Sequence, residues 1–133
     1  MQKMNRVLIV DDEADFRETL AKMFKRRNID TDMADGCHMA LEKLKACEFD
    51  VVIMDVSMPP GLDGIQCLVK VKEQWPTTEV IILTGHASVS SGIQGMKEGA
   101  FDYCLKPIDF EELLEKIELA WEKAQINRGR VIS

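Results

Sequence analysis

Charged and hydroxyl side chains stand directly after apolar runs at several places along the chain. They are Asp11 and Asp12 after residues 6–10, Asp55 after residues 49–54, Thr84 after residues 78–83, and Lys106 after residues 102–105. Carboxylates that lie within a few ångströms of one another repel, so a group of them needs a neutralising charge. An ammonium can supply it, and so can a divalent cation, for which oxygen donors favour Mg²⁺. The residue types therefore indicate a magnesium site beside a lysine, provided that the fold brings them together.

The apolar runs have the composition of buried strands, and the segments between them have helical spacing. Residues 6–10 (RVLIV) and 49–54 (FDVVIM) are typical of strands covered on both faces. The clearest amphipathic helix begins at Asp109, which is a good N-cap, with Glu112 placed for a capping box. Five strands are predicted, at residues 6–10, 30–34, 49–54, 78–83 and 102–105.

Strand and helix alternate five times, which predicts an α/β, doubly wound (βα)5 fold. Parallel pairing follows because each strand must return through a helix, and right-handed crossovers place helices on both faces of the sheet. Ligands of such sheets bind beyond the carboxyl ends of the strands. All the side chains singled out above, with Glu13 after the first strand, follow a strand end, so the fold should gather them at one edge.

Each of these residues also has a structural interpretation. An Asp after a strand is often only a helix N-cap, which is an alternative for Asp12 or Asp15. A single Thr84 is usually a structural hydroxyl, and a single Lys106 is usually solvated. Asp55 is harder to explain in this way, because it ends an apolar strand and Val56 follows it.

Size and charge exclude several classes of function. The chain has 133 residues and a net charge of −6, which disfavours binding to a nucleic-acid backbone or to an anionic membrane. It has no apolar run long enough for a membrane span, and the apolar run near its start is too short for a signal peptide. We expect a cytoplasmic protein with one domain over residues 1–127 and a frayed C-terminal tail over residues 128–133.

The cysteines predict neither a zinc site nor a disulfide. There are four of them, without a CxxC pair and without a histidine at metal-ligand spacing. We therefore expect reduced thiols in the core or on the surface.

Together these motifs resemble the receiver domain of two-component response regulators. The resemblance rests on Asp11-Asp12, Asp55, Thr84 and Lys106-Pro107, which follow the first, third, fourth and fifth strands. It covers residues 6–125, and the run LTGHASVSSGIQGMKEGAFDYCLKP is most similar to receivers of the nitrogen-regulation type. It implies a flavodoxin-like three-layer sandwich with strand order 2-1-3-4-5.

The resemblance also assigns roles to the site residues. Asp55 would be the phospho-acceptor, and the protein would be a signalling switch that assists its own phosphorylation and dephosphorylation rather than an enzyme. Mg²⁺ would be held by Asp12 directly, by Asp11 more often through water, by Asp55, and by the main-chain carbonyl of Ser57. The Lys106 ammonium and the Thr84 hydroxyl would contact phosphoryl oxygens.

The same resemblance implies a conformational switch through Thr84 and Tyr103. Tyr103 lies three residues before Lys106, where the family has its switch aromatic; a half-buried edge aromatic is the alternative. The helix predicted over 88–98 contains serines and glycines that weaken it, so we expect it to move on phosphorylation. The Lys106-Pro107 bond is expected to be cis. His86, near the mouth of the site, is interpreted as an ordinary loop residue.

The partners implied are a sensor histidine kinase or a phosphotransfer protein, with a possible homodimer through the fourth helix, fifth strand and fifth helix. One departure from the family is an extra residue in the turn Met58–Gly61, which puts the shape of that loop in doubt.

Three alternatives remain. The first is a flavodoxin-like cofactor binder, which needs a phosphate-binding loop where the acidic residues after the first strand stand. The second is a phosphohydrolase of the haloacid-dehalogenase kind, which needs Asp-x-Asp after its first strand. The third is a receiver-shaped scaffold that is never phosphorylated.

Overall fold

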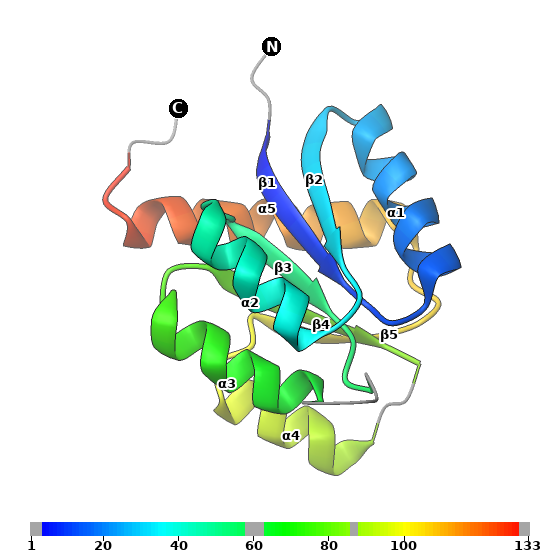
Figure 1. Ribbon diagram of the computed structural model, residues 1–133, viewed down its shortest axis with the longest axis vertical. Coiled ribbons are helices and arrows are strands. Elements are labelled where there is room, and N and C mark those ends of the chain that lie inside the picture. The colour runs from blue at the N-terminus through cyan, green and yellow to red at the C-terminus, as the bar shows by residue number, and fades with distance from the viewer. Residues whose placement is uncertain (1–3, 58–62, 86–87, 131–133) are drawn as a thin grey trace.

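A five-stranded parallel sheet forms the centre of the molecule (Figure 1). The computed structural model describes residues 4–57, 63–85 and 88–130. The strand order is β2-β1-β3-β4-β5, as the family resemblance implies. The strands are β1 (Met4–Val10), β2 (Ile29–Ala34), β3 (Val51–Met54), β4 (Glu79–Thr84) and β5 (Asp102–Leu105).

Helices cover both faces of this sheet, and Figure 1 shows α2 and α3 in front of it and α5 behind it. They are α1 (Ala14–Arg26), α2 (Cys37–Ala46), α3 (Gly64–Gln74), α4 (Val89–Lys97) and α5 (Phe110–Asn127). The chain is thus a doubly wound α/β sandwich of three layers, which confirms the predicted fold.

Alternate residues of the central strands face two separate cores. Leu8, Val52 and Ile82 pack with α2 and α3, while Ile9, Ile53 and Ile81 pack with α1 and α5. Because successive strand residues point to opposite faces, a strand that is covered on both sides must be apolar throughout. This explains the uninterrupted apolar runs in the sequence.

Polar caps set where the helices begin. Asp63 and Gln66 form a capping box at the start of α3, and Ser88 with Ser91 forms one at α4. Asp109 accepts the Glu112 amide at α5, as predicted, although only this half of the predicted capping box is seen. Gly99 follows the end of α4 with a φ of 99°, a conformation that suits glycine.

Two of the four cysteines form a disulfide, which corrects the prediction of reduced thiols. Cys37 in α2 is bonded to Cys67 in α3, with the Cα atoms 5.7 Å apart. The sequence carries no signal for this pair, because the two residues are 30 positions apart and meet only when α2 and α3 pack on the same face of the sheet.

Arg128 and Arg130, which follow the end of α5, contact residues near the start of β3. The sequence predicts fraying from residue 128, but Arg128 forms an ion pair with buried Asp50 and donates to the Phe49 carbonyl. Arg130 pairs with Glu48. Local polarity could not reveal these contacts, because their partners lie about 80 residues earlier. Residues 131–133 lie outside the described residues.

Within the described residues, none of the helices has the length and apolar character that crossing a membrane requires.

Candidate functional site

The pairing of β1 with β3 brings Asp11 and Asp55 to the same edge of the sheet. Val10 lies opposite Met54 in this parallel pair, so the next residue of each strand emerges at the same level. The Asp55 amide donates to the Val10 carbonyl at 3.0 Å. Both carboxylates are nearly inaccessible, with 1% and 2% of each residue exposed.

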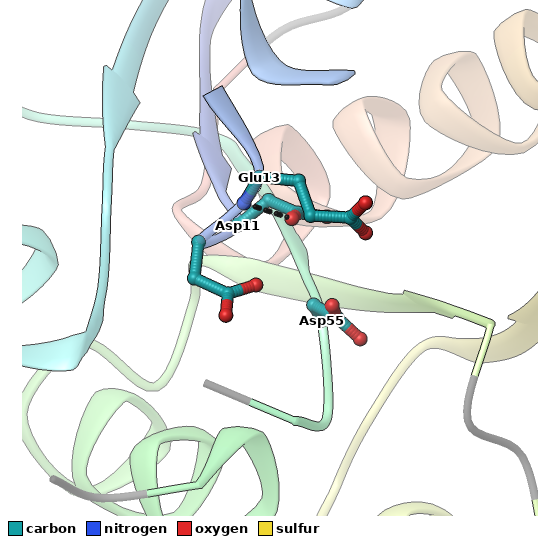
Figure 2. Close-up of side chains that lie close together, drawn as sticks. Asp11, Glu13 and Asp55 are labelled. Atoms are coloured by element: carbon teal, nitrogen blue, oxygen red, sulfur yellow. Dashed lines mark hydrogen bonds between the residues drawn. The ribbon is translucent and has the colours of Figure 1, made fainter. Parts of the chain in front are cut away.

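Four carboxylates gather at this edge. Oxygens of Asp11, Asp12, Glu13 and Asp55 all lie within 4.8 Å of one another, and Asp12 and Glu13 are exposed. Figure 2 shows Asp11 beside Glu13, whose amide donates to the Asp11 carboxylate at 2.9 Å, and Asp55 on the neighbouring segment. A set of carboxylate oxygens, partly open to solvent, fits the hard, oxygen-binding ion Mg²⁺.

Lys106 reaches into this acidic cluster from the end of β5. Its Nζ lies 2.7 Å from Asp11 Oδ2, 3.3 Å from Glu13 Oε1 and 3.8 Å from Asp55 Oδ2. The Lys106 amide donates to the Thr84 carbonyl at 2.9 Å, and the Lys106-Pro107 bond is cis, as predicted. Phe16 of α1 supports the ammonium, with its ring centroid 3.9 Å from Nζ.

Burial and nearby charges both shift the pKa values of Asp11 and Lys106. Burial raises the pKa of the Asp11 carboxyl above its ordinary value; the hydrogen bond from Lys106 opposes this shift, and the Asp55 charge adds to it. Burial also acts against the Lys106 ammonium, but its hydrogen bond to Asp11 and the charges of Asp11 and Asp55 outweigh burial and raise the pKa of Lys106. The lysine therefore stays charged and neutralises part of the cluster.

Thr84 and Tyr103 stand on the two neighbouring strands β4 and β5. Thr84 is fully buried at the end of β4, one strand away from Asp55. Tyr103 is half-buried, and its hydroxyl lies 2.5 Å from Ser91 Oγ of α4. The ring lies against Gly92 and Gly95, where an added Cβ would be 3.7 Å and 3.6 Å from it. Tyr103 thus connects β5 to α4.

The start of α3 lies against the backbone of Asp55. The Gly64 amide donates to the Val56 carbonyl at 2.7 Å, and a Cβ at Gly64 would lie 2.0 Å from the Asp55 carbonyl oxygen. Ser57 is partly exposed, and its amide is 3.4 Å from Asp55 Oδ1. The longer turn Met58–Gly61 and His86 lie outside the described residues.

Sequence reasoning missed two contributors to this site, Arg17 and Gly64, and it placed Glu13 at this edge without giving it a role. Glu13 belongs to the acidic cluster, Arg17 donates to the Asp11 carbonyl at 2.7 Å, and Gly64 allows α3 to approach Asp55. For Glu13 the signal was its place directly after Asp11-Asp12, whereas the roles of Arg17 and Gly64 depend on three-dimensional contacts.

A three-layer α/β sandwich with an acidic cluster and one lysine at the carboxyl edge of its sheet is the arrangement that the sequence resemblance implies. The family described as "Response regulator receiver domain" matches residues 7–118. The chain belongs to this family.

Comparison with known proteins agrees. The chain is 38% identical over 113 residues to the regulatory protein AtoC of Escherichia coli K12, covering 85% of this chain and 24% of AtoC. It is 37% identical over 120 residues to the transcriptional regulator NtrC of Proteus hauseri, covering 90% of this chain and 25% of NtrC. The beryllofluoride-activated NtrC4 receiver domain, solved as a dimer, is 34% identical with a TM-score of 0.83, and the match covers 90% of this chain and 98% of the NtrC4 chain.

These similarities define the general function of the chain and the share of its relatives' length that it spans. The chain is a phospho-accepting receiver domain of bacterial two-component signalling, similar to receivers of the nitrogen-regulation type. Domains of this family are signalling switches rather than classical enzymes; they bind Mg²⁺ at an acidic pocket, interact with histidine kinases and can dimerise. The chain spans about a quarter of the length of AtoC and NtrC.

Proposed function

We propose that Asp55 is the residue that accepts the phosphoryl group, from a histidine kinase or a phosphotransfer protein. One observation carries this assignment: Asp55 is a buried carboxylate at the end of β3, inside the acidic cluster and 3.8 Å from the Lys106 ammonium. A carboxylate oxygen of Asp55 attacks phosphorus, an acyl phosphate bond forms, and the bond from phosphorus to the donor atom breaks.

Mg²⁺ would be held by Asp11, Asp12, Asp55 and the main-chain carbonyl of Ser57. Support comes from the grouping of the carboxylates within 4.8 Å and from their all-oxygen chemistry. When bound, the ion supplies positive charge where phosphoryl oxygens arrive. Glu13 is the alternative ligand of the same cluster, because its oxygen also lies within 4.8 Å of the other carboxylate oxygens.

Lys106 and Thr84 would position the phosphoryl group. The Lys106 ammonium is already 3.8 Å from the acceptor oxygen, and phosphoryl transfer depends mainly on positioning and on neutralising charge. Its contact with Asp11 at 2.7 Å holds it in place before a phosphoryl group arrives. Thr84, at the end of the adjoining strand, would donate its hydroxyl to another phosphoryl oxygen.

The switch would run from Thr84 through Tyr103 to α4. The hydroxyl contact between Tyr103 and Ser91 means that a rotation of the side chain about χ1 must break a hydrogen bond to the first turn of α4. That helix buries little of its own surface, since Gly95 is the one residue of α4 that is buried. Elements with few buried contacts open most readily, so α4 is suited to respond.

The interaction face of the switch would be α4, β5 and α5. Apolar side chains are exposed there, with Val89 81% accessible; the others are Ile93, Met96, Leu105 and Leu119. Exposed apolar patches of this kind mark interaction sites. We propose a homodimer through this face; the NtrC4 receiver dimer supports dimerisation, and the exposed apolar side chains support the choice of face. Sedimentation with and without beryllofluoride tests it, and a monomer under both conditions would reject it.

The receiver unit would extend over residues 1–127, which includes the family match and all of α5. Membership in the family also supports a cytoplasmic location.

Incubation with acetyl phosphate and Mg²⁺, followed by intact mass measurement, tests the proposed function. We expect one labile phosphoryl group per chain, and none when EDTA removes the metal. An unmodified chain in both samples would instead support a scaffold that is never phosphorylated. Release of phosphate from a generic ester over many turnovers would support a phosphohydrolase.

A further inference from the structure

The disulfide between Cys37 and Cys67 lies close to the candidate site without being part of it. Cys37 is the first residue of α2 and Cys67 lies within the first turn and a half of α3. Both belong to the core shared by these helices and one face of the sheet, with 5% and 0% of each residue exposed. The other two cysteines are free, Cys47 exposed and Cys104 buried.

This cross-link brackets the segment that contains Asp55. The residues between the two cysteines include β3, which ends next to the acceptor. On the α3 side, the Cys67 amide donates to the Asp63 carbonyl at 2.9 Å, and the Gly64 amide donates to the Val56 carbonyl. The backbone of Cys67 therefore lies about one helical turn from the start of α3, which is hydrogen-bonded to Val56, the residue after the acceptor.

We propose that Cys37 and Cys67 form a reversible redox site, whose cross-link ties the start of α3 to α2. Disulfides of proteins in reducing compartments are usually transient or redox-sensing rather than permanent. The co-reactant would be a low-molecular-weight disulfide such as oxidised glutathione, and the reductant a low-molecular-weight thiol. The site is distinct from the carboxylate cluster and needs no phosphoryl group to operate.

The reaction is thiol–disulfide exchange in two steps. The Cys37 thiolate attacks one sulfur of oxidised glutathione, which forms a mixed disulfide and releases one glutathione. The Cys67 thiolate then attacks the Cys37 sulfur, forms the cross-link and releases the second glutathione. The two protein sulfurs are oxidised, the glutathione disulfide is reduced to two thiols, and these thiols take up the two protons lost by the cysteines.

The positions of the two sulfurs fit this order. Cys37 is at the N-terminus of α2, where helix amides favour a thiolate, and Gly36 provides no side-chain cap to hold the first turn. Because only 5% of Cys37 is exposed, the first step of the proposed reaction requires that turn to open. Cys67 is fully buried and has to react only with the neighbouring sulfur.

The cross-link would determine how firmly the segment from Asp55 to α3 is held. This consequence rests on the proposed function of Asp55. Cross-linking removes freedom from the enclosed loop, and this loop carries both Asp55 and Ser57. The redox state would thereby act on the acceptor through the backbone rather than through the carboxylates.

The formation of the cross-link is tested on the full chain with Cys47→Ala, which removes the exposed thiol. Reduced protein is incubated in the folded state with oxidised glutathione, denatured, alkylated and mapped by mass spectrometry. We expect a peptide that joins Cys37 to Cys67 and an alkylated Cys104, and we expect reduced glutathione to reverse the cross-link without denaturant. Alkylation of all three thiols, or a bond that only denatured protein loses, would overturn the proposal.

The mechanical effect is tested by comparing the oxidised and reduced forms of the same protein. We expect oxidation to raise the melting temperature by about 10 °C and to slow amide exchange in the first turn of α3 at least threefold. Cys37→Ser is the control, and it should show neither difference between oxidising and reducing conditions. Equal exchange in α3 of the two forms would refute the coupling to the acceptor segment, whether or not the protein is phosphorylated.

Discussion

The ammonium of Lys106 lies 2.7 Å from the Asp11 carboxylate, although 95 positions separate the two residues. In the sheet, β3 and β4 stand between their strands, so the lysine side chain extends across the carboxyl edge to reach β1. This contact joins the two ends of the site and balances part of its negative charge.

Removing this ammonium should destabilise the protein when Mg²⁺ is absent. In Lys106→Met, Asp11 and Asp55 lose their partly buried countercharge, and we expect a loss of about 2 kcal/mol in the free energy of unfolding. Added Mg²⁺ should restore more stability to the variant than to the wild type. Urea denaturation with EDTA and with Mg²⁺ measures both effects.

Lys116→Met is the matched control. Lys116 pairs with Asp102 in a more exposed position, where an ion pair contributes little. If the two lysine variants lost equal stability and responded equally to Mg²⁺, the neutralising role of Lys106 would be wrong.

A methyl group at position 64 should displace α3 from the acceptor. In Gly64→Ala the Cβ would lie 2.0 Å from the Asp55 carbonyl oxygen, a distance that only a backbone shift can relieve. We expect a loss of about 3 kcal/mol, measured by thermal and urea unfolding. Gly36→Ala, where a Cβ meets nothing within 4 Å, should change stability by less than about 1 kcal/mol. Similar losses for the two variants would contradict the close approach.

The ion pair between Arg128 and Asp50 should stabilise the end of the chain. Asp50 is buried and also accepts from Gln125 at 2.8 Å, so removing its cationic partner leaves a charge without compensation. Arg128→Ala should cost about 3 kcal/mol in urea denaturation. Arg130→Ala removes an exposed pair with Glu48 and should cost less than about 1 kcal/mol. If both variants lost equally little stability, the residues beyond α5 would contribute nothing to the free energy of unfolding.

The Cys104 thiol should react slowly at neutral pH. Burial, together with the Asp102 charge, raises the pKa of Cys104 from 9.0 to about 11. Because folding disfavours the thiolate, this group's contribution to stability decreases as pH rises from 9 toward 11. Alkylation of Cys104 in the folded protein should accelerate about tenfold per pH unit between pH 7 and 10. A rate that levels off at pH 9 would contradict this environment.

Pattern and topology together predicted most of the fold and the grouping of the candidate site. The alternation of apolar strands with amphipathic helices predicted a doubly wound parallel sheet, and the family resemblance supplied its strand order. Such a sheet places Asp11, Asp55, Thr84 and Lys106 at one edge whatever their separation in sequence. What the sequence could not supply were contacts between distant side chains with no periodic signal. The Cys37–Cys67 bond, the ion pair of Arg128 with Asp50, and the approach of Gly64 to Asp55 are all of this kind.

The location of the phosphoryl group tests the central claim most directly. Asp50 and Asp55 are both buried and stand at opposite ends of β3, so Asp50→Asn is a matched control for Asp55→Asn. After incubation with acetyl phosphate and Mg²⁺, peptide mapping should place one phosphoryl group on Asp55 in the wild type and in folded Asp50→Asn, and none in Asp55→Asn. A phosphoryl group that persists in Asp55→Asn, or that maps to another residue of the wild type, would contradict the assignment.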